Sequence, residues 1–188
     1  NALSSLMWSS YIGGSADDAA YSCYVDGAND IYVAGGTNSA NFPTTAGTLH
    51  TAYQDGLADG FIAHITGGGN TILQSSFMGT SLYDQCYFVQ LDVTGNVYVC
   101  GQTMGAYPVT AGVYSNAGGK QFVHKLNPNL SSTIYSTIYG TASANPNISL
   151  TAFLVDSCEN VYMSGWGRCL NFNAYSGNAL GMPVSPNA

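Results

Sequence analysis

The sequence predicts an all-β fold built from a repeated four-stranded antiparallel sheet. An Asn, a tyrosine and a glycine recur three times in one short pattern, and its tyrosines, Tyr32, Tyr98 and Tyr162, are 66 and 64 residues apart. Each copy follows a turn that opens with an aspartate, and the runs around these turns are rich in β-branched and aromatic residues. Such runs, bounded by Gly and Asn, are typical of strands, and a fixed period indicates a repeat architecture.

The first expected strand, Leu6–Tyr11, ends at Gly13-Gly14 and has echoes near residues 72–80 and 134–141. We therefore assign residues 1–14 to the outer strand of a preceding unit. The first unit, residues 15–79, then contains four expected strands: Ala20–Asp26, Ile31–Ala34, Phe61–Ile65 and Thr71–Phe77. Turns with Gly and Asn join the first pair of these strands and the last pair, as in β-hairpins.

The second unit, residues 80–140, repeats this order part by part. Its expected strands are Cys86–Asp92, Val97–Cys100, Phe122–Leu126 and Ser132–Ile138. The third unit, residues 141–188, offers only Leu150–Asp156 and Val161–Ser164 before a long segment that ends in Met182-Pro183-Val184. The expected count is therefore one strand, two complete units of four strands, and two further strands.

A radial stack of these units predicts a β-propeller fragment with two complete blades and partial blades at both ends. One four-stranded sheet cannot bury both of its faces, whereas neighbouring sheets can cover one another. The run Phe153-Leu154-Val155 is apolar on both faces, which favours a strand packed between two layers. A β-sandwich is the alternative, but the regular period disfavours it.

The repeat resembles the SBBP family of β-propeller repeats. The resemblance is carried by Tyr11-Ile12-Gly13-Gly14, Asn41-Phe42-Pro43-Thr44-Thr45, Asn96-Val97-Tyr98-Val99 and Phe122-Val123-His124-Lys125-Leu126. The last unit is also similar to repeats in large bacterial surface proteins associated with gliding motility and type IX export. The resemblance implies a propeller on a secreted or cell-surface protein, and it implies no catalytic residues.

Charge excludes several partners. Only 7% of the residues are charged, against about a quarter in an average domain. Ten acidic and three basic residues give a net charge of −7. Nucleic acid is not expected as a partner, because phosphate binding needs a basic patch. No run of about 18 apolar residues is present, so no membrane-spanning helix is expected. A surface rich in Ser, Thr, Asn, Gly and Tyr suits an extracellular setting.

Carboxylates offer candidate sites in two places, the hairpin turns and a loop between units. The turn aspartates Asp26, Asp92 and Asp156 are expected to cap their turns through backbone N–H groups, and metal ligation by these carboxylates is the alternative. Asp17 and Asp18 form the one pair of adjacent acids in a loop between units, where oxygen ligands could hold calcium. A solvated loop is the alternative, and no other cofactor is expected.

Aromatic side chains offer a recognition surface, because they present large amphipathic contact areas. Most tyrosines fall within expected strands, where packing between blades is the simpler role. Four lie in the long connecting segments and are the candidates for surface recognition: Tyr53, Tyr107, Tyr114 and Tyr175. Loops on a rigid scaffold are common carriers of recognition.

The cysteines predict one disulfide, between Cys158 in a hairpin turn and Cys169 in a segment that only the third unit has. Such a bond would restrain that segment by about 3 kcal/mol. Cys86 and Cys100 are expected at diagonal positions of one hairpin, and so unlinked.

These observations favour a non-catalytic extracellular module for adhesion, ligand binding or scaffolding, with a protein or glycan ligand. The alternatives are a structural subunit of a filament or secretion complex, and a propeller-type polysaccharide hydrolase or lyase. An enzyme of that kind needs clustered acids, and the inner-strand segments contain none: Ala20–Val25, Cys86–Leu91 and Leu150–Val155. Exposed edges and blade faces are a liability, so we expect a longer chain or a neighbouring polypeptide to complete the propeller.

Overall fold

The computed structural model describes residues 4–167, 179 and 181–186, and this part of the chain contains ten strands and no helix. The strands form three antiparallel sheets in which neighbours in sequence are neighbours in space. Blade 1 comprises β1 (Asp18–Val25), β2 (Ile31–Thr37), β3 (Asp59–Ile65) and β4 (Ile72–Met78). Blade 2 comprises β5 (Asp84–Leu91), β6 (Val97–Thr103), β7 (Gln121–Leu126) and β8 (Thr133–Tyr139). Blade 3 comprises β9 (Ser149–Val155) and β10 (Val161–Trp166).

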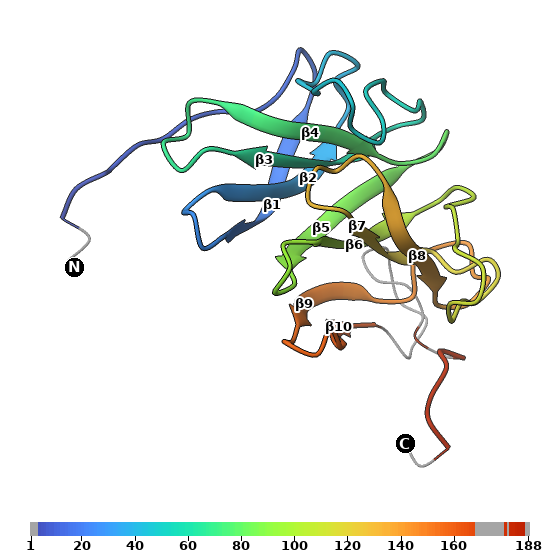
Figure 1. Cartoon of the computed structure of the whole chain (residues 1–188). Coiled ribbons are helices and arrows are strands. Elements are labelled where there is room, and N and C mark those ends of the chain that lie inside the picture. Colours follow the sequence, from blue (N-terminus) through green and yellow to red (C-terminus); the bar gives the residue numbers. More distant parts are fainter. Residues whose placement is uncertain (1–3, 168–178, 180, 187–188) are drawn as a thin grey trace.

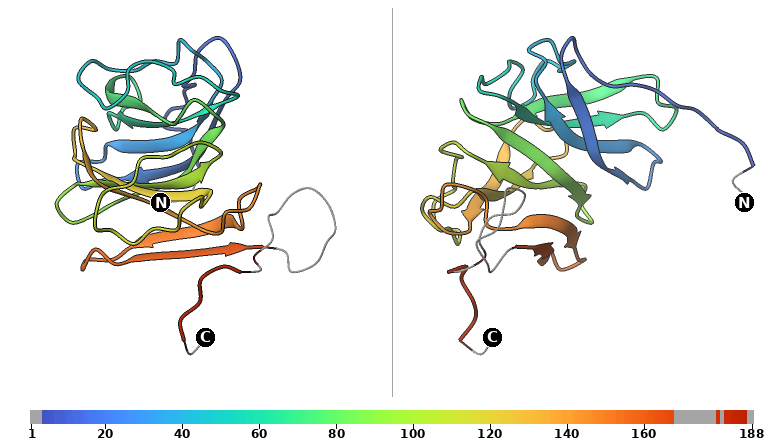
Figure 2. Two further views of the ribbon diagram at one scale, coloured as in Figure 1. Left: turned by 90° about the vertical axis from the view of Figure 1, so that its right-hand side faces the viewer. Right: turned by 180° about the vertical axis from the view of Figure 1, so that it is seen from behind.

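The three sheets are arranged as a fan, and Figures 1 and 2 show them as successive layers. The first strand of blade 2, β5, contacts the first strands of the other two blades, β1 and β9. One buried cluster joins blades 1 and 2 through residues such as Ile62, Met78 and Val97. A second cluster joins blades 2 and 3 through residues such as Tyr98 and Phe153. The predicted fold of stacked four-stranded blades is confirmed, and the described residues of the third blade form two strands.

The segment before β1 differs from the prediction, because Leu6–Tyr11 is not assigned as a strand. A strand requires a neighbour that supplies ladder hydrogen bonds, and none of the described strands pairs with this segment. It is held instead by Trp8, whose Nε1 donates a hydrogen bond to the carbonyl of Gly67 at 3.0 Å. Its assignment to a preceding blade stays a prediction.

A β-bulge occurs at the same place in each first strand. Pairing skips Tyr21 in β1, Tyr87 in β5 and Thr151 in β9. A bulge leaves one extra residue unpaired, bends the strand and can redirect a side chain. The side chains of Tyr21 and Tyr87 therefore do not follow the alternation of the paired residues on either side of them.

The bulge explains the glycine that follows the apolar run of each second strand. A β-carbon added to Gly101 would lie 1.9 Å from the carbonyl oxygen of Gln85, and one added to Gly35 would lie 2.0 Å from that of Ala19. At Gly165 the corresponding distance, to the oxygen of Ser149, is 2.5 Å. The bulged strand thus places a carbonyl where any larger residue would put its side chain.

The long connections between the second and third strands run along the outer edge of their own blades. The Thr45 N–H donates to the carbonyl of Ser75, and Thr110 donates in the same way to Ser136. In return, the Phe77 N–H of β4 donates to the carbonyl of His50, and the Thr137 hydroxyl of β8 donates to the carbonyl of Tyr114. An exposed edge strand invites association with other chains, and these segments cover part of each edge.

An aromatic residue before proline anchors each of these connections in the core. Phe42 is 3% exposed and packs on Phe61, with ring centroids 4.3 Å apart. Tyr107 is 5% exposed and stacks on Phe122 at 4.0 Å. The prediction that Tyr107 belongs to a recognition surface was wrong, because this motif buries its ring to fix the connection to the sheet.

Candidate functional site

The turn aspartates cap their turns, as predicted. Oδ1 of Asp26 accepts hydrogen bonds from the N–H groups of Ala28 and Asp30. Asp92 and Asp156 accept equivalent bonds from the residues two and four positions later. The three turns share one conformation, so blades can be compared residue by residue at this end.

In blade 2 this turn holds a buried ion pair. The ammonium Nζ of Lys125 lies 2.9 Å from Oδ2 of Asp92 and 2.7 Å from Oε2 of Glu159, in the corresponding turn of blade 3. It also sits over the ring of Tyr98, 4.8 Å from the centroid. Although burial opposes the effect, hydrogen bonds from Lys125, Asn96 and other donors hold the pKa of Asp92 well below its usual range. Lys125 therefore links two blades as a permanently charged group.

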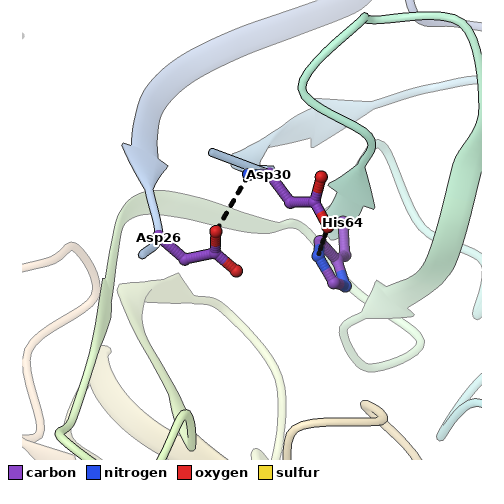
Figure 3. Close-up of side chains that lie close together, drawn as sticks. All are labelled: Asp26, Asp30 and His64. Atoms are coloured by element: carbon purple, nitrogen blue, oxygen red, sulfur yellow. Dashed lines mark hydrogen bonds and ion pairs between the residues drawn. The ribbon is translucent and has the colours of Figure 1, made fainter. Parts of the chain in front are cut away.

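In blade 1 the same position carries His64 in place of lysine. His64 pairs with Tyr32 across β2 and β3, as Lys125 pairs with Tyr98 across β6 and β7. One atom each of Asp26, Asp30 and His64 lie within 4.8 Å of one another, and all three residues are partly buried (Figure 3). A nitrogen and two carboxylate oxygens form a donor set that transition metals accept. This cluster was missed from the sequence, because His64 and the turn acids are more than thirty residues apart.

The neighbours of His64 fix its orientation. Its ring stacks on that of Tyr32, with centroids 4.1 Å apart and planes 11° apart. Nδ1 lies 2.6 Å from Oε1 of Gln74, and Nε2 lies 3.6 Å from Oδ2 of Asp30. Burial, together with the charges of Asp26 and Asp30, raises the pKa of Tyr32 to about 12, so its ring stays neutral.

The bulged tyrosines make a second candidate site, on the first strands of blades 1 and 2. The rings of Tyr21 and Tyr87 are 5.5 Å apart, and Nε2 of Gln85 donates a hydrogen bond to the hydroxyl of Tyr21 at 3.0 Å. Burial raises the pKa values of Tyr83 and Tyr87, and the nearby tyrosine hydroxyl of Tyr21 adds to both increases. Tyr21 is 45% exposed, and the other members are partly buried. The cluster combines open aromatic surface with amide groups.

A buried acid pair lies at the opposite end of the blades. Asp59 and Asp84 are both fully buried, and an added β-carbon at Gly79 would lie 2.6 Å from Oδ1 of Asp59 and 3.3 Å from Oδ2 of Asp84. Burial raises the pKa of Asp59 to about 7, and the charge of Asp84 adds to this. In the next blade the corresponding glycine, Gly140, is flanked by the amides of Gln121 and Asn147. Amide groups around Gly140 therefore take the positions that carboxyl groups take around Gly79.

The change Asp59→Asn is expected to stabilise the protein at pH 8 by up to about 4 kcal/mol, since the pKa is raised by about three units and each unit corresponds to about 1.4 kcal/mol. The folded pKa of Asp59 lies above its ordinary value of 3.8, so its contribution to stability is lost as pH rises from about 4 to about 7. The variant lacks this loss, and the two proteins should converge near pH 4. Urea unfolding at both pH values measures the difference, with Asp17→Asn as an exposed control. Equal pH slopes in both proteins would contradict the assignment.

The predicted calcium candidates have separate environments. Asp17 is exposed, whereas Oδ2 of Asp18 accepts hydrogen bonds from the N–H of Gly14 and the hydroxyl of Ser39. Asp84 and Asn147 make the equivalent bond to Thr80 and Thr141 before their own blades. Asp18 thus belongs to a repeated loop cap, and calcium binding there stays a prediction.

The other predicted residues are spread over the molecule. Tyr114 is 64% exposed, while Tyr53 is partly buried with its ring edge against Phe77. Tyr175 and Cys169 lie outside the described residues, so the predicted bond to the exposed Cys158 stays a prediction. Cys100 pairs with Phe88, two positions beyond Cys86, which confirms the predicted diagonal relation.

The structure has two hollows beside the blades, one at the open side of blade 1 and one between blades. A cavity of about 640 Å³ lies between the segment before β1 and blade 1, lined by Trp8, Tyr11, Ile31 and Ile72 among others. A cavity of about 310 Å³ lies between blades 2 and 3, lined by Tyr135, Tyr139, Met163 and Met182 among others. Both are mainly apolar, as surfaces between packed sheets are.

The comparison with protein families agrees with this architecture. Residues 8–43 match the SBBP model, described as a beta-propeller repeat, and no curated protein matches the chain. The match begins at Trp8, before β1, and extends through β2 to the aromatic anchor of the first long connection. In the described residues, no helix is long and apolar enough to cross a membrane. The chain is an all-β protein of β-propeller blades, and the match supports its relation to the SBBP repeat family.

Proposed function

We propose that this chain is a non-catalytic, extracellular propeller module of a large bacterial surface or secreted protein, and that it binds a neutral glycan. The observation that carries the proposal is the pair of bulged tyrosines, Tyr21 and Tyr87, which adjoining blades present side by side. The amide of Gln85 sits at the same surface. A rigid scaffold with aromatic faces and amides can bind a flat polar ligand at a low entropic cost.

Charge favours a neutral ligand over an acidic one. The chain carries a net charge of −7 and three basic residues, so an anionic polymer would be repelled from most of the surface. Tyr83 and Tyr87 keep their protons at neutral pH, because burial raises their pKa values. Their hydroxyls can therefore donate hydrogen bonds to sugar oxygens while their rings pack against sugar C–H groups.

Replacing both tyrosines tests the proposal. In the variant Tyr21→Ala/Tyr87→Ala, binding to neutral oligosaccharides on a glycan array should weaken at least about tenfold, since two aromatic contacts of about 1 kcal/mol each are lost. Thr151→Ala is the matched control, because Thr151 occupies the same bulge in blade 3. Absence of binding by the unaltered chain, or equal binding by the double variant, would contradict the proposal.

A scaffolding role is the second candidate, and exposed apolar side chains on blades 1 and 3 favour it. Val25 is 56% exposed, and Tyr162 and Trp166 of blade 3 are more than half exposed. Surfaces of this kind are typical of sites that another sheet covers. We propose that further blades, from a longer chain or a neighbouring polypeptide, pack on these faces.

A further inference from the structure

We propose that Asp26, Asp30 and His64 of blade 1 bind a divalent transition metal ion of the zinc class. Their donor atoms lie within 4.8 Å of one another. The set comprises one imidazole nitrogen and two carboxylate oxygens, which suits Zn²⁺ better than Ca²⁺, an ion that prefers oxygen ligands alone. Figure 3 shows the three side chains converging from the β1–β2 turn and from β3.

The hydrogen bonds of His64 leave a lone pair directed at a carboxylate. Oε1 of Gln74 can only accept, so Nδ1 of His64 is the donor in their 2.6 Å contact. In the neutral ring Nε2 then carries the lone pair, and it is a buried atom that has no hydrogen-bond partner in the described structure. It faces Oδ2 of Asp30, also an acceptor, at 3.6 Å. Two facing acceptors repel each other unless a cation lies between them.

The equivalent place in blade 2 contains a cation of the protein itself. The ammonium of Lys125 lies against Asp92 and over the ring of Tyr98, the counterparts of Asp26 and Tyr32. Blade 1 keeps the tyrosine and adds a second carboxylate, Asp30, where blade 2 has Asn96. It therefore has more negative charge at this position and no lysine, and a bound metal ion would restore the balance.

The ligands are also held in advance. Oδ1 of Asp26 accepts two backbone N–H groups, and Oδ1 of Asp30 accepts the N–H of Gly67 at 2.9 Å. Each carboxylate thus keeps its second oxygen for a ligand. A hydrogen bond from the other ring nitrogen orients His64, as is usual for metal-binding histidines.

Titration of the metal-free chain with ZnCl₂ at pH 7.5, followed by calorimetry and by thermal unfolding, tests this proposal. We expect one ion per chain and a rise in Tm of several degrees, with a smaller response to CaCl₂. Asp30→Asn keeps the Oδ1 bond to Gly67 and should weaken Zn²⁺ binding at least about tenfold. His64→Lys copies blade 2 and should abolish the response while raising the Tm of the metal-free chain.

Two further results would overturn the proposal. One is Zn²⁺ binding that both variants leave unchanged, which would place the ion elsewhere. The other is a chain that does not bind Zn²⁺ and whose His64 ring is doubly protonated at pH 7.5 by ¹⁵N NMR. That result would make the proton the cation that separates Nε2 from Asp30.

The variant Lys125→His provides the reverse test in blade 2. It should not create a Zn²⁺ site, because Asn96 stands where blade 1 has the second carboxylate, Asp30.

Discussion

Replacing Lys125 with methionine is expected to lower the free energy of unfolding by about 3–5 kcal/mol. The change removes the ammonium that lies 2.9 Å from Asp92 and 2.7 Å from Glu159. The Asp92 side chain has no exposed surface, so its charge would be left buried without compensation. Methionine has a similar length, which limits the loss of packing. Chemical unfolding at pH 7 measures the effect.

A second substitution separates the pair from its environment. The double variant Lys125→Met/Asp92→Asn should recover most of the loss, because the amide can still accept the turn N–H groups and carries no charge.

The pH dependence of stability follows from the same contact. The pKa of Asp92 in the folded state is depressed, so its stabilisation is present above about pH 4 and is lost as pH falls further. If the single variant Lys125→Met unfolds with a free energy within about 1 kcal/mol of that of the unaltered protein, the ion pair does not stabilise the fold as expected.

Gly101→Ala is expected to cost about 4 kcal/mol or more, among the largest effects of single substitutions. The new β-carbon would lie 1.9 Å from the carbonyl oxygen of Gln85 and 2.9 Å from the Phe122 ring. The obstacle is backbone that belongs to the bulge at Tyr87, so relief requires the bulge to move. Gly27→Ala is the control, since nothing lies within 4 Å of its added β-carbon, and it should change stability by less than about 0.5 kcal/mol. A small effect at Gly101 would show that the bulge is not rigid.

The strands and turns could be predicted because their determinants are local. Alternation and turn residues place all ten described strands within a few residues, and the turn aspartates act on N–H groups two and four positions away. The starts of β1 and β5 were predicted two residues late, because Asp18 and Asp84 cap the preceding loops from within the strand, at positions where a carboxylate suggests a loop. The segment Leu6–Tyr11 has a strand-like composition, but none of the described strands pairs with it.

The candidate sites could not be predicted because they depend on register and on contacts between blades. His64 meets Asp30 only when β2 and β3 align Tyr32 with His64. Tyr21 and Tyr87 meet only because bulges redirect them from adjacent blades, and alternation alone assigns such tyrosines to packing. Comparison of corresponding positions across repeats would have shown one useful difference, the exchange of Lys125 for His64. Tyr107 misled because a residue in a long connection usually lies on the surface.

Successive blades stack with their first strands adjoining, so that bulged tyrosines of different blades meet. Nuclear Overhauser effects between the aromatic protons of Tyr21 and Tyr87, in protein with isotope-labelled tyrosine, measure this contact directly. The ring centroids lie 5.5 Å apart, so a strong cross-peak is predicted, and it should vanish in Tyr21→Ala. A chain that gives no such cross-peak, while Tyr32 and His64 within blade 1 still show theirs, would contradict the stacking of the blades.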